Sequence, residues 1–302
     1  MTTSSSPGTP RERAGRTNGG RSPVSGFCVK PLRSGSSGNL TLVEHAGTTL
    51  LVDAGLPSQR GLASALSEAG VAWDDIDALL VSHLHTDHIH PSAVACCARH
   101  QVPILLHEKN LRAFSRRVLS RSPQPGPLRT FGAEPFSVGS IEVRPFAVPH
   151  DAEGVTSGFL LSARAGGRDV RVAMATDLGS GGNGLYERFI DSDLILIESN
   201  YDPGMLQRSH RHPFDRARVD SDVGHLSNEQ AGKFLVRVLQ ESRKLPRAVV
   251  LCHLSADHNS PVVAVGEVRR ILSRYGFGEI PVHAARRDGP SPRFFAMEAG
   301  ER

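Results

Sequence analysis

Four potential metal ligands lie within six residues of one another: His83, His85, Asp87 and His88. They follow the apolar run 78–81, which has the length and composition of a buried strand. Side chains two residues apart on an extended segment point to the same face, so His83 and His85 lie together there. The turn after them brings Asp87 and His88 back toward the same space. The end of one strand can therefore serve two metal ions.

The chain that must position these ligands has a composition typical of soluble globular proteins. Its 302 residues are 39% hydrophobic and 22% charged, and a chain of this length can bury one large core or two small ones. Its longest apolar runs have the length of strands and are far below the roughly 18 residues that span a bilayer. We therefore expect no membrane-spanning segment and no membrane partner.

Two further features predict a cytoplasmic protein. Residues 1–26 lack the apolar core that a secretory signal needs. The four cysteines, Cys28, Cys96, Cys97 and Cys252, include no C-x-x-C pair and make a poor disulfide framework. This cysteine usage favours a reducing compartment.

The positive charge of the chain gathers at its N-terminus. The net charge is +4, and residues 1–25 contain four arginines against one glutamate, so the rest of the chain carries a net charge of only +1. Sixteen of these 25 residues are Ser, Thr, Gly or Pro, a composition too poor in apolar groups to fold. We expect residues 1–26 to form a disordered basic tail and residues 27–302 to form one nearly neutral domain.

Short strands and helices are predicted along this domain, in two successive sets separated by the proline-rich stretch 120–128. The strands are too apolar to face water on both sides. We therefore predict an α/β fold in which two sheets pack together and helices cover their outer faces, a four-layer αββα sandwich. The predicted strands are 27–32, 39–45, 48–53, 78–82, 103–107, 141–149, 157–163, 170–176, 194–198 and 248–253, and the predicted helices are 58–69, 91–100, 227–241 and 262–275.

A doubly wound nucleotide-binding fold is the rival architecture. The glycine-rich segment 34–39 is the only candidate for its phosphate fingerprint, but a strand follows that segment instead of a helix. The segment therefore has no helix N-terminus that could bind a phosphate. This favours the four-layer sandwich over the nucleotide-binding fold.

The ligand cluster resembles the HxHxDH motif of the metallo-β-lactamase superfamily. Three more residues, each at the end of an apolar run, match the remaining ligands of that superfamily: His150, Asp177 and His253. The resemblance implies two metal sites bridged by Asp177, one formed by His83, His85 and His150 and the other by Asp87, His88 and His253.

The chemistry of these ligands limits the choice of metal. Imidazole and carboxylate groups without a cysteine suit borderline divalent ions, so Zn²⁺ is the first expectation and Mn²⁺ the second. Two such ions about 3.5–4 Å apart can share a hydroxide and hold both oxygens of a phosphoester, which makes water the nucleophile. The resemblance also implies that Asp53, which ends the strand 48–53, orients metal-bound groups. An ordinary turn residue is the other interpretation of Asp53.

Several segments resemble one branch of the superfamily, the YycJ/WalJ group of cytoplasmic exonuclease-like hydrolases. They are residues 34–39, 197–202, 224–228 and 253–261. The resemblance extends from residue 27 to the C-terminal strand. It implies a dinuclear metal-dependent phosphodiesterase that degrades nucleic acid, as a 5′-3′ exonuclease on DNA or else on RNA.

His225 is the subject of a second prediction from resemblance. In tRNA-processing relatives a comparable histidine, paired with an acidic residue, assists the leaving group, and Glu198 is the acidic candidate here. Together with Asp87 these two residues form the predicted catalytic set. The alternative is that His225 only precedes a helix, because Ser227 and Gln230 have the spacing of a capping box.

Two features depart from the pattern of the family. The glycine that usually follows the motif is replaced by Ile89-His90-Pro91, which we expect to change only the start of the next helix. The body also has one Trp and three Tyr, whereas a strand-binding groove usually combines basic residues with aromatic platforms. Two basic clusters are candidates for substrate contacts: Arg112, Arg116, Arg117 and Arg121, and His210, Arg211, His212, Arg216 and Arg218.

The neutral body keeps other functions open. A small-molecule or cyclic-nucleotide-type phosphodiesterase is the first alternative. Lactam or thioester hydrolysis is weaker, because Asp87 and Asp177 resemble the ligands of the phosphodiesterases. A non-catalytic, metal-stabilised binding module is a further alternative, although a purely structural site rarely keeps a position open for water. The sequence does not determine the oligomeric state.

Overall fold

The computed structural model describes residues 24, 26–121, 126–180, 182, 184–298 and 300. The predicted disordered tail, residues 1–26, lies outside the described residues except for Val24 and Gly26. All four cysteines are buried, and none of the four forms a disulfide. Within the described ranges, no helix has both the length and the apolar character needed to cross a membrane.

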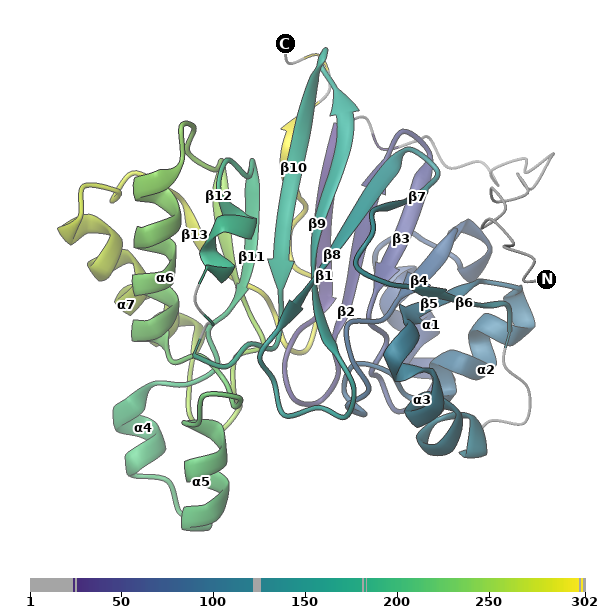
Figure 1. The fold of residues 1–302 in the computed structure, drawn as a ribbon, viewed down its shortest axis with the longest axis horizontal. Coiled ribbons are helices and arrows are strands. Elements are labelled where there is room, and N and C mark those ends of the chain that lie inside the picture. Colours follow the sequence, from purple (N-terminus) through teal and green to yellow (C-terminus); the bar gives the residue numbers. More distant parts are fainter. Residues whose placement is uncertain are drawn as a thin grey trace, which may run out of the picture.

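Two seven-stranded sheets form the centre of the molecule (Figure 1). In each sheet an antiparallel meander continues into parallel strands. The first sheet has the order β14 (Phe294–Glu298), β1 (Gly26–Arg33), β2 (Leu40–His45), β3 (Thr48–Val52), β4 (Ala78–Leu80), β5 (Ile104–His107) and β6 (Leu128–Phe131). The second has the order β13 (Val282–Ala284), β12 (Ala248–Cys252), β11 (Leu194–Glu198), β10 (Arg168–Ala175), β9 (Thr156–Ala165), β8 (Ile141–Val148) and β7 (Phe136–Val138).

Helices cover the outer faces of the two sheets (Figure 1). The first sheet is covered by α1 (Gln59–Glu68), α2 (Pro91–His100) and α3 (Leu111–Arg117), and the second by α6 (Asn228–Glu241) and α7 (Pro261–Arg274). Two short helices, α4 (Pro203–Gln207) and α5 (Pro213–Val219), extend beyond the strand ends at the lower left of Figure 1. The remaining helical turns are η1 (Trp73–Asp75), η2 (Glu108–Asn110), η3 (Leu119–Arg121) and η4 (Leu185–Phe189).

Three buried clusters hold these layers together. One lies between the sheets and includes Phe27 from the first and Phe159 from the second. A second cluster joins the first sheet to its helices, and a third joins the second sheet to α6 and α7. Strands β2, β3, β11 and β12 are buried at every position, as strands covered on both faces must be. The predicted four-layer αββα sandwich is therefore confirmed.

The direction of the strands brings their carboxyl ends to one edge of the sandwich. β3, β4 and β5 run parallel in the first sheet, and β10, β11 and β12 run parallel in the second. The residues that follow or end these strands, among them Asp53, Asp177 and His253, thus share one edge. Ligands in open parallel sheets generally bind at this edge.

Every strand and helix predicted from the sequence is present, with ends that agree within two residues. The elements not predicted are short: β6, β7, β13 and β14, and helices α3, α4 and α5. β6 and β7 have four and three residues and are partly exposed, so they show no hydrophobic period that a sequence reading could detect.

Candidate metal centre

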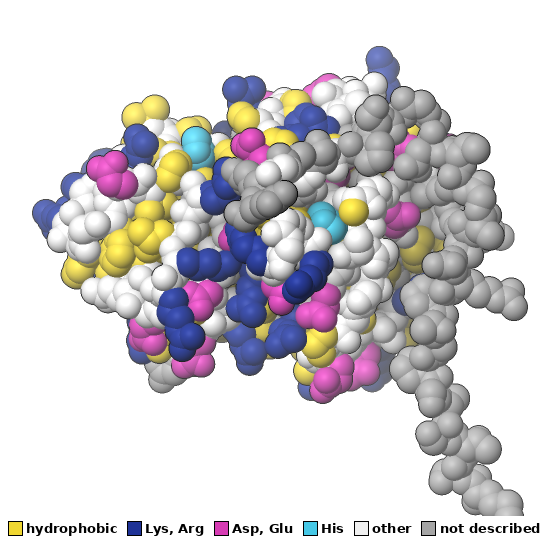
Figure 2. Space-filling view, turned by 90° about the horizontal axis from the view of Figure 1, so that it is seen from above, with side chains coloured by type: hydrophobic (Ala, Val, Ile, Leu, Met, Phe, Trp, Pro, Cys, Tyr) yellow, Lys and Arg dark blue, Asp and Glu magenta, His cyan; other side chains and the backbone are white. Residues whose placement is uncertain are grey.

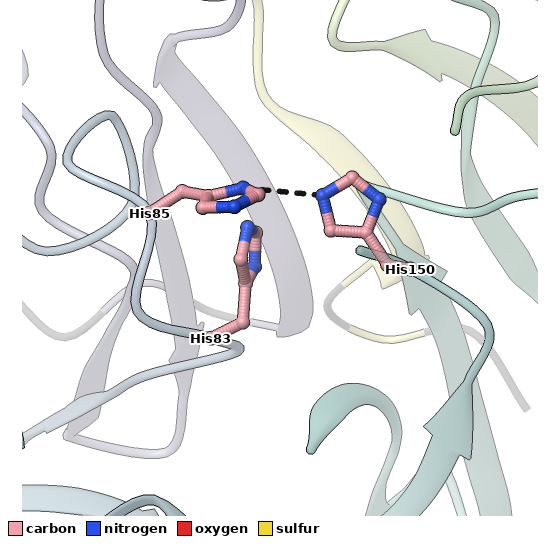
Figure 3. A group of neighbouring side chains, drawn as sticks. All are labelled: His83, His85 and His150. Atoms are coloured by element: carbon pink, nitrogen blue, oxygen red, sulfur yellow. Dashed lines mark hydrogen bonds between the residues drawn. The ribbon is translucent and has the colours of Figure 1, made fainter. Parts of the chain in front are cut away.

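The first three predicted ligands come together from two parts of the chain. His83 and His85 lie on the segment after β4, and His150 follows β8. Their ligand atoms lie within 4.8 Å of one another, and Figure 3 shows the three rings turned toward one another. Nδ1 of His85 lies 3.2 Å from Nε2 of His150. These three imidazoles, here named the first triad, could hold one divalent ion.

Asp87, His88 and His253 form the second triad, with ligand atoms equally close together. Nε2 of His253 lies 3.3 Å from Oδ2 of Asp87, and Nε2 of His88 lies 3.8 Å from the same oxygen. His88 and His253 are almost fully buried, whereas the Asp87 side chain is 24% exposed. Solvent can thus reach this triad on the side of Asp87.

Asp177 lies between the two triads, directly beyond β10. Its Oδ2 lies 2.8 Å from Nε2 of His88 in the second triad. Its Oδ1 lies 3.7 Å from Nε2 of His150 in the first triad. A carboxylate with one oxygen toward each group could bridge two ions.

The residues of the first triad fit a divalent cation. Nε2 of His83 is buried and has no hydrogen-bond partner, although Nδ1 of the same ring lies 3.0 Å from the Ser82 hydroxyl. Nδ1 of His150 donates to the Gly224 carbonyl at 3.0 Å, which leaves its Nε2 for a ligand. A buried polar atom without a partner is costly, and a cation would satisfy it. Imidazole nitrogens and carboxylate oxygens without thiolate suit Zn²⁺ or Mn²⁺.

Asp53 contacts residues that support both triads: His88 of the second, and Ser82, which lies beside His83 of the first. Its Oδ2 lies 2.8 Å from Nδ1 of His88, so that His88 presents Nε2 to the centre. The same carboxylate accepts hydrogen bonds from the Ser82 backbone N–H and the Ser82 hydroxyl, each at 2.8 Å. Asp53 has a φ of +60°, in the left-handed region that is uncommon for non-glycine residues, although aspartate adopts it more readily than most. The orienting role that the resemblance implied for Asp53 stays a prediction.

Backbone hydrogen bonds hold the loop that carries Asp87 and His88. The Asp87 carbonyl accepts from the Asn39 N–H at 2.7 Å, and the His88 carbonyl accepts from the Ala54 N–H at 2.7 Å. A Cβ added at Gly55 would lie 1.8 Å from the Asp87 carbonyl oxygen. Only glycine therefore permits this close approach of the two segments.

His253 is held in a left-handed backbone conformation, with φ of +54°. Its N–H donates to the Ser34 hydroxyl at 2.9 Å, and its carbonyl accepts from Nδ2 of Asn200 at 2.8 Å. These contacts come from both sheets, because Ser34 follows β1 and Asn200 follows β11. The ligand position of His253 thus depends on the packing of the whole sandwich.

His225 and Glu198 form the pair that the sequence predicted. Nδ1 of His225 lies 2.7 Å from Oε1 of Glu198, and the same oxygen lies 3.0 Å from Nδ1 of His253. The capping box of α6 is also present, with reciprocal hydrogen bonds between Ser227 and Gln230. The two interpretations of this segment are therefore compatible, since His225 lies two residues before the cap.

Carboxylates determine the electrostatics of the second triad. Burial disfavours a charged His88, but Asp177 and Asp53 outweigh burial and raise the pKa of His88 well above its usual value. Burial also opposes charge on His253, yet Asp177 and the hydrogen bond to Asp87 raise its pKa to about 10. The second triad thus favours positive charge, whether from protons or from a metal ion.

The first triad has the opposite character. Burial, followed by the neighbouring imidazoles, lowers the pKa of His83 well below its usual value. Burial and His150 lower the pKa of His85 to about 4. These imidazoles are neutral at pH 7, which is the form that binds metal.

Arginines beside the site are held by carboxylates. Both predicted basic clusters contain such pairs, and the side chains involved are largely exposed, so each pair stabilises the fold only weakly. Arg121 is the one member of the clusters whose side chain lies outside the described part of the chain. The pairs are Arg116 and Arg117 with the same Glu153, Arg211 with Asp257 and Arg218 with Asp151.

The end of the molecule away from the site has the same balance of charge. Figure 2 views this end, and Lys and Arg side chains there have Asp and Glu among them. Asp193, at the start of β11, pairs with Arg168 at 2.7 Å and with Lys244 at 2.8 Å. The described body thus agrees with the nearly neutral charge that the sequence indicated.

Sequence reasoning gave no role to several side chains that position ligands. Asn39, Ser82 and Asn200 were unassigned, although Asn39 and Asn200 lie in segments that carry the family resemblance. His90 is the N-cap of α2, where its Nδ1 accepts from the Ser92 N–H at 3.2 Å, and Pro91 is the first residue of the helix. The helix α2 thus begins with a proline in its first turn.

Comparisons with known proteins agree with this geometry. A family model described as the metallo-beta-lactamase superfamily matches residues 33–194. Exodeoxyribonuclease YycJ from Bacillus anthracis is 32% identical over 261 residues, which cover 84% of this chain and 92% of YycJ. Exodeoxyribonuclease WalJ from Streptococcus pneumoniae is 31% identical over 235 residues, which cover 78% of this chain and 84% of WalJ.

Solved structures with low sequence identity share the fold. The crystal structure of human tRNase Z, short form, has a TM-score of 0.58 and 18% sequence identity, and the match covers 88% of this chain and 98% of that chain. A likeness at this identity concerns the architecture alone.

Proposed function

The chain is a metal-dependent hydrolase that belongs to the metallo-β-lactamase superfamily, and from this premise we propose that it is a dinuclear phosphodiesterase. The proposed substrate is DNA, degraded as a 5′-3′ exonuclease. The observation that carries the proposal is the convergence of both triads, Asp177 and the His225–Glu198 pair on one edge of a chain similar to YycJ along most of its length.

We assign the proposed metal ligands as follows. One ion would be held by the first triad and a second by the second triad, with Asp177 between them. Zn²⁺ is the proposed ion and Mn²⁺ the alternative, because the donors are nitrogen and carboxylate oxygen. Such a pair of ions, when bound, activates water and stabilises charge on the phosphoryl oxygens.

His225 is the proposed proton donor to the leaving oxygen. Its Nδ1 is engaged by Glu198 at 2.7 Å, which fixes the ring orientation and leaves Nε2 free to act on substrate. Burial opposes a charge on the ring, but Glu198 outweighs burial and raises the pKa of His225. The ring is therefore protonated more readily than a free histidine, as an acid catalyst needs to be.

Asp53 is the proposed orienting residue of the centre. It holds Nδ1 of His88 and both donors of Ser82, so one carboxylate fixes parts of both triads. Partners of this kind typically change metal affinity or activity about 10- to 100-fold when lost. The proposed role of Asp53 is positional, because its side chain is buried and contacts His88 and Ser82.

A small-molecule phosphodiesterase is the second candidate function. It is favoured by the ion pairs beside the site, where Arg116, Arg211 and Arg218 each face a carboxylate. A long polyanion would gain less from such neutralised arginines than from free ones. The relatives named exodeoxyribonucleases support DNA as the first candidate. Membership of a hydrolase family also argues against the alternative of a non-catalytic binding module.

Digestion of end-labelled nucleic acids tests the proposal. The purified protein is incubated with Zn²⁺ or Mn²⁺ and with 5′- or 3′-labelled DNA and RNA, single- and double-stranded, beside a folded Asp87→Ala variant. We expect metal-dependent release of nucleotides from the 5′ end of DNA, absent in the variant. Cleavage of a small chromogenic phosphodiester without digestion of any strand would contradict the exonuclease and support the second candidate.

A further inference from the structure

We propose that the α4–α5 arm, residues 203–219, binds the single strand of nucleic acid that extends from the metal centre, with a base stacked on Phe214. The proposal rests on the nucleic acid substrate proposed above and adds a residue that interacts with it. It concerns a surface that lies outside both triads and takes no part in holding metal.

Phe214 is exposed to an extent that is unusual for its type. Its side chain is 73% exposed, while phenylalanine is among the residues most often buried. Of the large apolar side chains that are exposed in the described part of the chain, it alone lies on the arm. An isolated aromatic ring is a poor protein interface, which needs a contiguous apolar patch, but it suits the face of one unpaired base.

The backbone around Phe214 is fixed. Pro213 begins α5, and the Phe214 N–H donates to Nδ1 of His212 at 3.2 Å. Arg216 ties the two helices together, because its Nη1 donates to the Gln207 carbonyl at 2.8 Å. A ring on a fixed support loses little freedom when a base stacks on it.

Both ends of the arm are joined to the metal centre. At its start, the Asp202 N–H donates to the His258 carbonyl at 2.8 Å, five residues after His253. At its end, the His225 N–H donates to the Val219 carbonyl at 2.9 Å. A strand bound on the arm is therefore held in a defined position relative to the centre.

Arg218 gives the arm a further link to the first triad. Its Nη2 donates to Oδ1 of Asp151 at 2.9 Å, and that oxygen lies 3.6 Å from Nε2 of His150. The arm thus reaches the triad through a single carboxylate.

A cavity of about 590 Å³ lies on the side of the arm that faces the loop after His253. Its volume is within the range that holds nucleotide-sized ligands. Arg208 forms no ion pair among the described residues, so its guanidinium can contact a phosphate. The cavity is lined by Met205, Arg208, Ser209, His210, Arg211 and Asp257.

The neutral charge of this region favours base stacking over long-range electrostatic attraction of the strand as the source of affinity. Residues 202–222 contain four arginines and four aspartates, so the arm and its ends are neutral overall. Affinity for a strand must then come from the ring and from single guanidinium contacts. Base stacking on an aromatic side chain is tolerant of sequence, so we expect little preference among bases.

Kinetics of the full-length, metal-loaded protein test this proposal. Phe214→Ala is expected to raise KM for a single-stranded oligonucleotide about tenfold and to leave kcat within about twofold. Phe214→Trp is expected to restore the original KM, and Arg208→Gln to raise it by a smaller factor. All three variants should hydrolyse a small chromogenic phosphodiester at the original rate, which shows that the metal centre is intact.

Tyr275→Ala is the matched control. Tyr275 is also an exposed aromatic residue, at 57%, but it lies at the far end of the 14-residue helix α7, about 20 Å from the start of that helix beside the site. We expect this variant to behave as the original protein on both substrates.

The outcomes separate the two proposals. If the original protein degrades single strands and Phe214→Ala keeps the original KM, the role of the arm is wrong and the nuclease function stands. If Tyr275→Ala raises KM as much as Phe214→Ala does, the proposed stacking of a base on Phe214 is also wrong, because the effect is then not specific to the arm. If the original protein hydrolyses the chromogenic diester but no strand, the proposed function itself fails.

Discussion

The two triads of the candidate metal centre are built in different ways. The first consists of three imidazoles, and its supports are a serine hydroxyl at His83 and a backbone carbonyl at His150. The second contains a carboxylate ligand, and carboxylates also support its histidines: Asp53 lies 2.8 Å from His88, and Glu198 lies 3.0 Å from His253. The second triad therefore holds more negative charge close to its ligand atoms.

This difference has a consequence for metal binding. His83 and His85 of the first triad are neutral, because burial lowers their pKa values. The histidines of the second triad carry protons in the absence of metal, because Asp177 and other carboxylates raise the pKa values of His88 and His253. Metal binding at the second triad must release these protons, whereas the first triad is ready to bind. We expect the two ions to bind in two distinguishable steps.

The largest expected effect comes from Asp87→Ala. Asp87 is the carboxylate of the second triad, and its loss removes one of the two anionic ligands proposed for the second ion, the other being Asp177. We expect kcat/KM for DNA to fall about 10³-fold, since a missing ion forfeits several kcal/mol of charge stabilisation. Metal analysis of the folded variant should find one ion per chain. A variant that keeps two ions and full activity would show that Asp87 is no ligand.

His225→Ala should affect only substrates with poor leaving groups. The loss of an acid catalyst costs about 10²- to 10⁴-fold, and the larger part of this range applies where the leaving oxygen needs a proton. We expect turnover of DNA to fall at least about 10²-fold, while a p-nitrophenyl diester is hydrolysed at nearly the original rate. Equal losses on the two substrates would mean that His225 shapes the site and transfers no proton.

Asp53→Asn is expected to weaken the second triad more than the first. The change removes the charge that holds Nδ1 of His88 at 2.8 Å but keeps the size of the side chain. Metal titration should show a loss of about 10- to 100-fold in affinity at the second site. The matched control is Asp74→Asn, because Asp74 pairs with His100 at 2.9 Å on the surface and should leave metal binding unchanged. No change in Asp53→Asn would reduce Asp53 to a strand-end turn residue.

Gly55→Ala tests the close approach of Gly55 to the loop that carries Asp87 and His88. The new methyl group would lie 1.8 Å from the Asp87 carbonyl, so the loop must move, at a cost of about 1–3 kcal/mol in the free energy of unfolding. Chemical denaturation measures this loss. Gly266→Ala is the control, because Gly266 has open space around its Cβ position within α7 and should gain about 0.5–1 kcal/mol. Equal stability of the two variants would show that the loop of Asp87 can move away from residue 55 at no cost in stability.

The sequence indicated where the candidate ligands lie, because strand ends determine their positions. His83, His150, Asp177 and His253 each follow an apolar run that became a strand, and the strand directions then carried them to one edge. This inference needed only periodicity and the resemblance to a known motif.

The supporting contacts could not be predicted in the same way. Asn39, Ser34 and Asn200 hold ligands that lie far from them in the sequence, and such contacts depend on the packing of the two sheets. The α4–α5 arm was also missed, because its two helices have five and seven residues and too few apolar positions to show a period.

Reconstitution of the metal-free protein tests the dinuclear centre most directly. DNA hydrolysis is measured as Zn²⁺ is added in small steps up to three equivalents per chain. We predict little activity up to one equivalent, a rise between one and two equivalents, and no further gain after the second. Full activity at one equivalent would contradict the account, because the second triad would then be unnecessary for the reaction.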